Sequence, residues 1–138
     1  MLGWREWLAL PEFGVPAIKA KVDTGARSSA LHAHNLRMVM RSGEEYALFE
    51  VHPQQRKSTP SYGVEARVLD RRKVTSSGGH QEDRPVIVVD IEIMGKRWPI
   101  EVTLTSRDSM GFRMLLGRQA IRRRFIVDPG RSYLAGRS

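Results

Sequence analysis

The sequence predicts a mainly β protein folded as one domain, residues 1–138. Two observations predict it: apolar and polar residues alternate in several segments, and Gly, Pro and Ser separate these segments at short intervals. A chain of 138 residues is long enough to bury a hydrophobic core without cross-links. It contains no cysteine, which excludes disulfides and thiolate metal sites.

The first predicted strand is Pro16–Asp23. Its apolar residues fall on one face, and these are Ile18, Ala20 and Val22. Its polar residues fall on the other face, and these are Lys19, Lys21 and Asp23. This period of two indicates a half-buried strand that ends at Asp23.

A β-hairpin is predicted over Val86–Thr105, with its turn at Gly95–Lys96. The first strand places apolar residues on one face, at Ile87, Val89, Ile91 and Ile93. The return strand does the same with Trp98, Ile100, Val102 and Leu104, against Arg97, Glu101 and Thr103 on its polar face. Two matched alternating strands of this kind are typical of a sheet with one buried side.

The rest of the chain gives weaker signals. Between Val51 and Arg84 the sequence is polar and basic, which predicts long loops and one strand, Val64–Leu69. A short helix is expected from Gly117 to about Arg123. After it we expect a strand at Phe125–Val127 and a turn at Pro129–Gly130.

The leading candidate for chemistry is the loop that begins at Asp23. An aspartate at a strand end, followed by Thr24 and Gly25, can be held still because threonine bonds to nearby backbone and glycine allows a tight turn. The plain alternative is a β-turn that uses Asp and Gly for their turn propensity alone. A second segment, Met114–Arg118, has the apolar pair and glycine of a strand that crosses beside this loop.

Taken with the hairpin between them, the two segments resemble the retropepsins, a family of aspartic endopeptidases, over residues 15–128. A bacterial subfamily labelled "ATP-dependent zinc protease" is especially similar, and some of its members accompany ATP-grasp ligases that add glutamates to a ribosomal protein. That closer similarity lies in Lys19–Ala33, Arg71–Val74, Glu82–Val86 and Leu116–Ile121. The resemblance implies a closed β-barrel with one short C-terminal helix.

It also implies the chemistry of an aspartic endopeptidase. Two aspartates share a proton, one activating water as a base and the other donating to the scissile carbonyl. This chain has a single Asp-Thr-Gly, so the resemblance implies a homodimer with one aspartate per chain. Asp23 would be the catalytic acid and base, Thr24 would brace the loop, and Gly25 would offer its carbonyl to the substrate.

One departure from the family bears on the substrate. Retropepsins commonly carry an acid after Asp-Thr-Gly-Ala that pairs with the arginine of the Gly-Arg motif, whereas here both positions are arginine, Arg27 and Arg118. Further basic residues lie near the expected flap, whose glycine is either Gly63 or Gly78–Gly79; these are Arg67, Arg71, Arg72, Lys73 and Arg84. Together with Arg27, Arg113 and Arg118 they could line a cleft for the substrate. We therefore expect an acidic, glutamate-rich peptide substrate held by Ala26, Arg27, Arg72, Arg84 and Arg118, since guanidinium groups bind carboxylates well.

Two other functions stay open. The net charge of +8 is also compatible with a non-catalytic basic domain that binds nucleic acid or the ribosome. Alternatively, His32 and His34 share a strand face and, with His52 or His80 as a third ligand, would form a metallopeptidase site. We expect no metal, because there is no His-Glu-x-x-His motif and a third ligand would have to come from His52 or His80 by accident of the fold. We also expect no cofactor, because there is no phosphate-binding loop motif, and any ATP dependence would belong to a partner ligase.

The expected location is the cytoplasm, with no membrane partner. The first 16 residues lack the apolar run of a signal peptide, and no segment approaches the roughly 20 apolar residues that span a bilayer.

Overall fold

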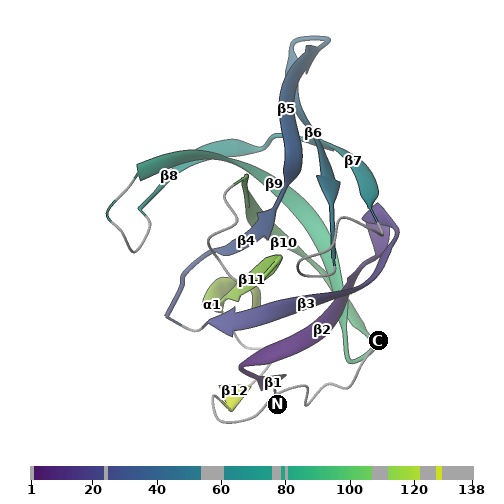
Figure 1. Ribbon diagram of the computed structural model, residues 1–138, viewed down its shortest axis with the longest axis vertical. Helices are drawn as coiled ribbons and strands as arrows, with labels where there is room; N and C mark the ends of the chain where they lie inside the picture. Colours follow the sequence, from purple (N-terminus) through teal and green to yellow (C-terminus); the bar gives the residue numbers. More distant parts are fainter. Residues whose placement is uncertain are drawn as a thin grey trace.

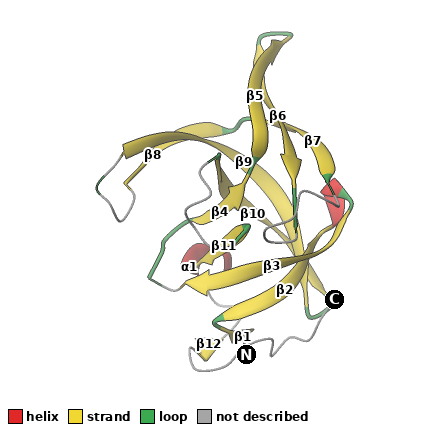
Figure 2. Cartoon of the chain, in the orientation of Figure 1, coloured by secondary structure: helices red, strands yellow, loops and turns green. Residues whose placement is uncertain are grey.

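In the computed structural model the chain forms a closed β-barrel (Figure 1). The structure describes residues 2–23, 25–53, 61–75, 79, 81–106 and 112–121, and the backbone of 127–128. Strands dominate this part of the chain, with one short α-helix and one 3-10 turn (Figure 2). The predicted fold class, a mainly β closed barrel with a short C-terminal helix, is confirmed.

The strands are, in chain order, β1 (Leu2–Gly3), β2 (Arg5–Leu10), β3 (Val15–Asp23), β4 (Ser29–His32), β5 (His34–Arg41), β6 (Glu44–Val51), β7 (Tyr62–Arg67), β8 (Asp70–Thr75), β9 (Gln81–Ile93), β10 (Lys96–Thr105), β11 (Met114–Gly117) and β12 (Val127–Asp128). The 3-10 turn η1 (Pro11–Phe13) joins β2 to β3, and the helix α1 (Arg118–Ile121) follows β11.

Six strands close the barrel, in the order β10-β4-β11-β3-β2-β9, because β9 pairs with both β2 and β10. The strand β8 is attached outside this ring, on the first half of β9. Strands β5, β6 and β7 form a separate antiparallel sheet, and the β5–β6 hairpin projects away from the barrel (Figure 1).

The predicted strand at the Asp-Thr-Gly segment is confirmed as β3, with Ile18, Ala20 and Val22 buried. The predicted hairpin is confirmed as β9–β10, but its turn lies at Met94–Gly95, not at Gly95–Lys96. Both turn residues have positive φ, 54° and 74°, as in the tight turns whose twist matches that of paired strands.

Thr103 differs from its expected place on the polar face of the hairpin. It is 2% exposed, because β4 pairs alongside β10 at this position and the Thr103 hydroxyl donates to the carbonyl of Ser29 at 3.3 Å.

The prediction of long loops between Val51 and Arg84 is wrong in the described part of that segment. Besides β7, it contains β8 and the start of β9. The polar composition has a structural reason, because these strands carry cross-strand ion pairs on their exposed sides. Arg71 pairs with Glu45 at 2.7 Å and Arg67 with Glu44 at 3.1 Å, so basic residues that look like a loop belong to sheets.

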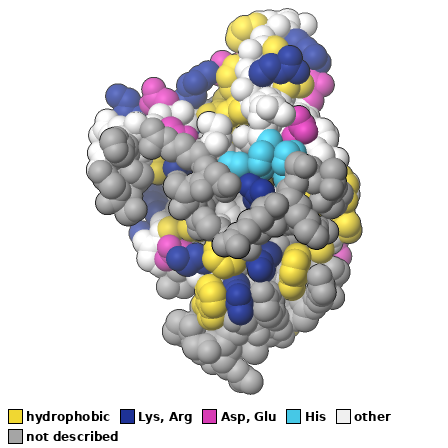
Figure 3. Space-filling model, in the orientation of Figure 1, with side chains coloured by type: hydrophobic (Ala, Val, Ile, Leu, Met, Phe, Trp, Pro, Cys, Tyr) yellow, Lys and Arg dark blue, Asp and Glu magenta, His cyan; other side chains and the backbone are white. Residues whose placement is uncertain are grey.

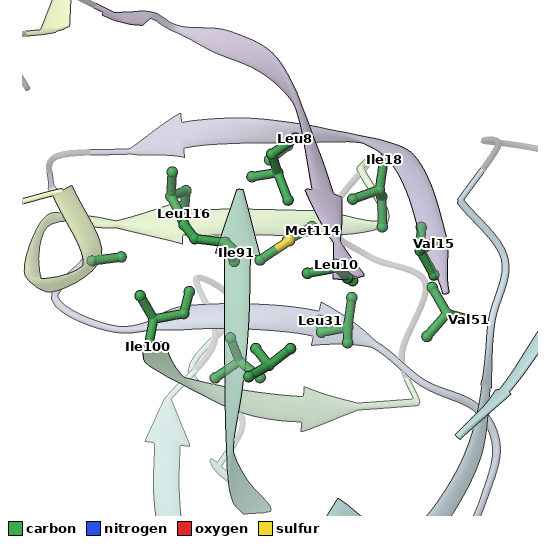
Figure 4. Close-up of a cluster of buried hydrophobic side chains, with 14 of the residues drawn as sticks. Leu8, Leu10, Val15, Ile18, Leu31, Val51, Ile91, Ile100, Met114 and Leu116 are labelled. Carbon is green, nitrogen blue, oxygen red and sulfur yellow. The ribbon is translucent and has the colours of Figure 1, made fainter. Parts of the chain in front are cut away.

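The hydrophobic core lies inside the ring of strands (Figure 4). Every strand of the ring contributes to it, and the labelled side chains include Leu8, Ile18, Leu31, Ile91, Ile100, Met114 and Leu116. Val51 from β6 packs against the same cluster, which joins the three-stranded sheet to the barrel. The core thereby holds β3 and β11, the two strands that flank the Asp23 loop, in fixed positions.

The short helix begins at Arg118, close to the predicted start at Gly117. Its last described turn is fixed by the buried indole of Trp98, whose Nε1 donates to the carbonyl of Ala120 at 2.9 Å. The predicted helix end near Arg123, the strand residues Phe125 and Ile126, and the turn at Pro129–Gly130 lie outside the described residues. No helix in the described part of the chain has the length and apolar run that crossing a bilayer takes.

Replacing Met94 by Asn is expected to stabilise the protein. Met94 adopts a φ of 54°, which is costly for most side chains and tolerated by asparagine, and Gly95 already follows it. We expect the free energy of unfolding to rise by about 0.5–1 kcal/mol in urea titrations. The control is Met40→Asn, another exposed methionine, in β5 and without positive φ, which should give no gain. Equal gains in both variants would show that side-chain polarity, not backbone conformation, is responsible.

Candidate active site

Asp23 ends β3 at the point where β11 runs parallel beside it. The register pairs Leu116 with Val22 and Gly117 with Asp23, so the predicted crossing of the Leu-Leu-Gly segment beside the aspartate is confirmed. Because Asp23 alternates with the buried Val22, its half-buried side chain lies on the outer face of the strand. Thr24, the second predicted site residue, lies outside the described residues.

The loop after Asp23 is held by its own backbone. The amide of Gly25 donates to Oδ1 of Asp23 at 2.9 Å, and the amide of Ala26 donates to the carbonyl of Asp23 at 3.1 Å. These two bonds fix the carboxylate relative to the loop. A carboxylate fixed in this way is suited to proton transfer, because its orientation need not be found anew for each reaction.

Gly117 packs against the same loop more closely than any other residue type could. A Cβ atom at this position would lie 2.5 Å from the carbonyl oxygen of Ser28 and 3.0 Å from that of Ala26. The amide of Gly117 donates to the hydroxyl of Ser29 at 3.0 Å. The start of α1 adds a further bond, from the amide of Arg118 to the carbonyl of Ala26 at 2.8 Å. The glycine of the Leu-Leu-Gly segment is therefore required by space.

Two of the predicted substrate-binding arginines meet in one pocket beside this loop. Arg27 and Arg72 line a cavity of about 530 Å³, together with Ser28, Ser29, Trp98, Pro99, Ile100, Glu101, Gln119 and Ala120. Arg27 is exposed there, and Arg72 is half-exposed and ion-paired with Glu101. The pocket therefore offers charged groups of both signs, and Arg27 is the one in it with no carboxylate partner among the described residues.

The other predicted arginines lie around the same region. Arg84 stands directly opposite Arg72 in the β8–β9 pair and is ion-paired with Glu82 at 3.4 Å. Arg118 is exposed, and its guanidinium donates to the carbonyl of Gly25 at 3.4 Å. Ala26 supplies the carbonyl that accepts from the amide of Arg118.

Arg67 and Arg71, by contrast, do not join this group. They are bound to Glu44 and Glu45 at the three-stranded sheet.

The two positions expected for the flap glycine fall in different parts of the fold. Gly79, with φ of 82°, lies between these two strands, whereas Gly63 lies inside β7 and not at a hairpin end. Gly78 is outside the described residues. The β8–β9 hairpin extends from the barrel as a long arm (Figure 1).

Three histidines come together around an arginine. The ring of His34 stacks on that of His52 with centroids 3.7 Å apart, and it meets His32 edge-on at 4.1 Å. The guanidinium of the buried Arg113 donates to Nδ1 of His32 and to Nε2 of His34, both at 3.2 Å.

This cluster does not fit a metal ion. A guanidinium only donates, so the two histidine nitrogens that it reaches are acceptors whose lone pairs are engaged. Within the described residues, no three His, Cys, Asp or Glu side chains are arranged to hold a metal, and His80 lies outside them.

Beside the histidines, Glu50 has a pKa lowered to about 2, because Asn35, Ser61 and His52 all hydrogen-bond to its carboxylate.

Two features of the site were not anticipated from the sequence. Ser29, which accepts from the amide of Gly117, looks like an ordinary loop serine, and nothing in its neighbourhood signals that contact. Arg113, expected from the sequence to line the substrate cleft with Arg27 and Arg118, is instead buried, at 6% exposed. Its histidine partners are 79 and 81 residues away in the chain, so no local pattern reveals them.

One family model and several known proteins are similar to this chain over nearly its whole length. The model of the RimB-like family, described as retropepsin-like aspartic endopeptidase RimB, matches residues 1–138. A probable alpha-L-glutamate ligase of Shewanella pealeana is 48% identical over 136 residues, and one of Desulfotalea psychrophila is 46% identical over 129 residues. The matches cover 99% and 94% of this chain but only 30% and 28% of those relatives.

A solved structure supports the fold. The crystal structure of a protein of unknown function from Legionella pneumophila superposes with a TM-score of 0.80 at 31% identity. The match covers 97% of this chain and 96% of that one.

Replacing Gly117 by Ala is expected to destabilise the protein and disturb the Asp23 loop. The new methyl group would meet backbone atoms of Ser28 and Ala26, which cannot swing aside as a side chain can. We expect a loss of about 1–3 kcal/mol in the free energy of unfolding, measured in urea.

The matched control is Gly63→Ala, where a Cβ would have no atom within 4 Å and stability should be unchanged or slightly higher. Wild-type stability in Gly117→Ala would contradict the close packing described here.

Proposed function

The chain belongs to the RimB-like family of retropepsin-like aspartic endopeptidases, and from this premise we propose that it hydrolyses peptide bonds with Asp23 as the catalytic carboxylate. The observation that carries the proposal is the fixed position of that carboxylate. It is held by the amide of Gly25 on a loop that Gly117 packs against from the neighbouring strand. A reactive carboxylate on the outer face, supported by the core through β3 and β11, is what acid–base chemistry needs.

The proposed mechanism uses two copies of Asp23. One carboxylate takes a proton from a water molecule, which attacks the scissile carbonyl carbon, while the other, protonated, donates to the carbonyl oxygen. Collapse of the tetrahedral intermediate breaks the C–N bond as the leaving nitrogen takes up a proton. Because the 138 residues contain one Asp-Thr-Gly, we propose that the second carboxylate comes from a second copy in a two-fold symmetric dimer.

Basic groups beside the loop support an acidic substrate. Arg27 is exposed in the pocket beside the loop that follows Asp23, Arg72 lines the same pocket, and Arg84 is the cross-strand neighbour of Arg72. Arg118, the first residue of α1, contacts the same loop, because its guanidinium donates to the carbonyl of Gly25. Peptides that carry several carboxylates would bind these guanidinium groups with favourable geometry, so we propose glutamate-rich peptide tails as the substrate.

The relatives suggest a partner activity. Several are named probable alpha-L-glutamate ligases, and the match to this chain occupies less than a third of their length, for example 30% in Shewanella pealeana. The ligase name therefore belongs to longer proteins, most of whose sequence has no counterpart in this chain. We propose that a glutamate ligase of the ATP-grasp type acts with this chain, one adding the glutamates that the other removes.

Replacing Asp23 by Asn is expected to abolish hydrolysis of a glutamate-tailed peptide, since an amide can neither accept the proton of water nor share one with its partner. Turnover is measured across pH, with and without a chelator, and wild-type activity should be insensitive to the chelator.

The control is Asp90→Asn, which removes a carboxylate of β9 that pairs with Arg97 on the surface, and its activity should equal wild type. Activity that persists in Asp23→Asn, or that a chelator removes, would refute the aspartic mechanism.

Dilution is expected to lower the specific activity, because the proposed site is complete only in a dimer. Adding an excess of Asp23→Asn protein to wild type should also inhibit it, since mixed dimers contain one carboxylate. Both effects are measured by turnover at a series of protein concentrations, alongside sedimentation equilibrium. A specific activity that stays constant while sedimentation reports a monomer would refute the dimeric site.

A further inference from the structure

A group of cationic and aromatic side chains covers the outer face of β2 and β3. The strand register places Arg5 opposite Lys21 and Trp7 opposite Lys19. All four alternate with buried residues of the two strands and are themselves half-buried. We call Arg5, Lys19 and Lys21 the β2–β3 cation row.

Aromatic rings lie between the members of this row. The Nζ atom of Lys19 lies 5.8 Å from the ring centre of Phe112 and 6.0 Å from that of Trp7. The guanidinium of Arg5 lies 4.6 Å from the ring centre of Trp4, and Trp4 meets Phe112 edge-on at 6.1 Å. Hydrophobic and basic side chains alternate over the lower part of the face seen in Figure 3, where β2 and β3 run. The rings hold the ammonium group of Lys19 in place without neutralising it.

The two lysines of the row differ from most arginines of the barrel surface. Within the described residues, neither Lys19 nor Lys21 has a carboxylate within ion-pair distance, whereas Arg72 and Arg97 are each bound to one. Two adjacent positive charges that are not ion-paired generate a local positive potential, which favours an anionic partner.

The row leads to the proposed catalytic carboxylate. Lys19, Lys21 and Asp23 occupy successive outward positions of β3, so Lys21 lies two residues, about 7 Å of strand, from Asp23. On the neighbouring strand β11, the half-buried Leu115 is in register with Lys21. An ammonium group, an aliphatic side chain and an aromatic ring therefore line the approach to Asp23 from this side.

We propose that the β2–β3 cation row is a binding track for the acidic side chains of a peptide, with Lys21 as a specificity-determining residue beside the scissile bond. Lys21 binds the carboxylate of a substrate residue next to that bond. Leu115 and Phe112 contact the aliphatic part of the same substrate side chain. Lys19 binds the next acidic residue along the chain. This inference rests on the proposed function, and it adds residues that do not belong to the Arg27 pocket.

A peptide suits this surface better than nucleic acid does. The ring faces of Trp4, Trp7 and Phe112 are approached by Arg5 and Lys19, so they do not form an open platform for stacked bases. The row also ends at Asp23, whose negative charge would repel a continuing phosphate backbone. A peptide with spaced carboxylates can place an uncharged peptide bond at that position.

The test measures binding apart from turnover. In the Asp23→Asn background, the affinity for a fluorescent oligoglutamate peptide is measured by anisotropy for the protein with and without Lys19→Gln and Lys21→Gln together. We expect the dissociation constant to rise roughly five- to tenfold, as for the loss of two exposed charge pairs, and the difference to shrink at high salt. The control is Lys96→Gln in the same background, an exposed lysine at the β9–β10 turn, which should bind as the parent does.

Each outcome decides between the alternatives. Unchanged oligoglutamate affinity in the double lysine variant, or an equal loss in Lys96→Gln, would overturn the proposal. A larger loss for an oligouridine probe than for the peptide would overturn it in favour of nucleic acid.

Because these measurements involve no hydrolysis, a chain without peptidase activity could still show the lysine-dependent binding. Conversely, the protein could be an active peptidase whose KM for glutamate peptides is unchanged in the double lysine variant. That result would leave the proposed function standing and refute this inference.

Discussion

The contact between Gly117 and the loop after Asp23 is the constraint on which the rest of the site depends. The backbone of β11 approaches the carbonyl of Ser28 so closely that no side chain fits between them. That approach lets the amides of Gly117 and Arg118 bond to Ser29 and Ala26. The loop is therefore bound on one side by the barrel and on the other by its own bonds to Asp23, and side chains of Ser29 and Arg118 add to this support.

The strand β9 connects this site to the remainder of the fold. Its first half pairs with β8, its second half with β10, and Glu92 near its end with Ala9 of β2. One continuous strand of 13 residues thus closes the barrel and also forms half of the extended β8–β9 arm. Because the buried side chains of β9 are part of the core, the position of that arm relative to the Asp23 loop is set by core packing and not by the arm alone.

The sequence was informative where burial is one-sided. β3, β9 and β10 could be predicted because one face of each meets the core and the other meets water, and the pairing of β3 with β11 followed from two short motifs together with a family resemblance. The strand β8 could not be predicted, because its sequence, Asp-Arg-Arg-Lys-Val-Thr, has the polar composition of a loop. Its cations pair with acids distant in the chain, such as Glu45 and Glu101. The burial of Arg113 among histidines depends on the folded barrel in the same way.

The distribution of counter-charges, more than the net charge of +8, determines which basic residues can select a substrate. Arg72 and Arg84 are bound to Glu101 and Glu82, so an incoming carboxylate must compete with an existing partner and gains less from these two arginines than from a cation without one. Lys19 and Lys21 face no such competition among the described residues, and the rings beside Lys19 lower the cost of ordering its long side chain. Selectivity for acidic chains is for this reason expected to reside mainly on the β2–β3 side of Asp23 and in Arg27, while the paired arginines of β8 and β9 stabilise the arm.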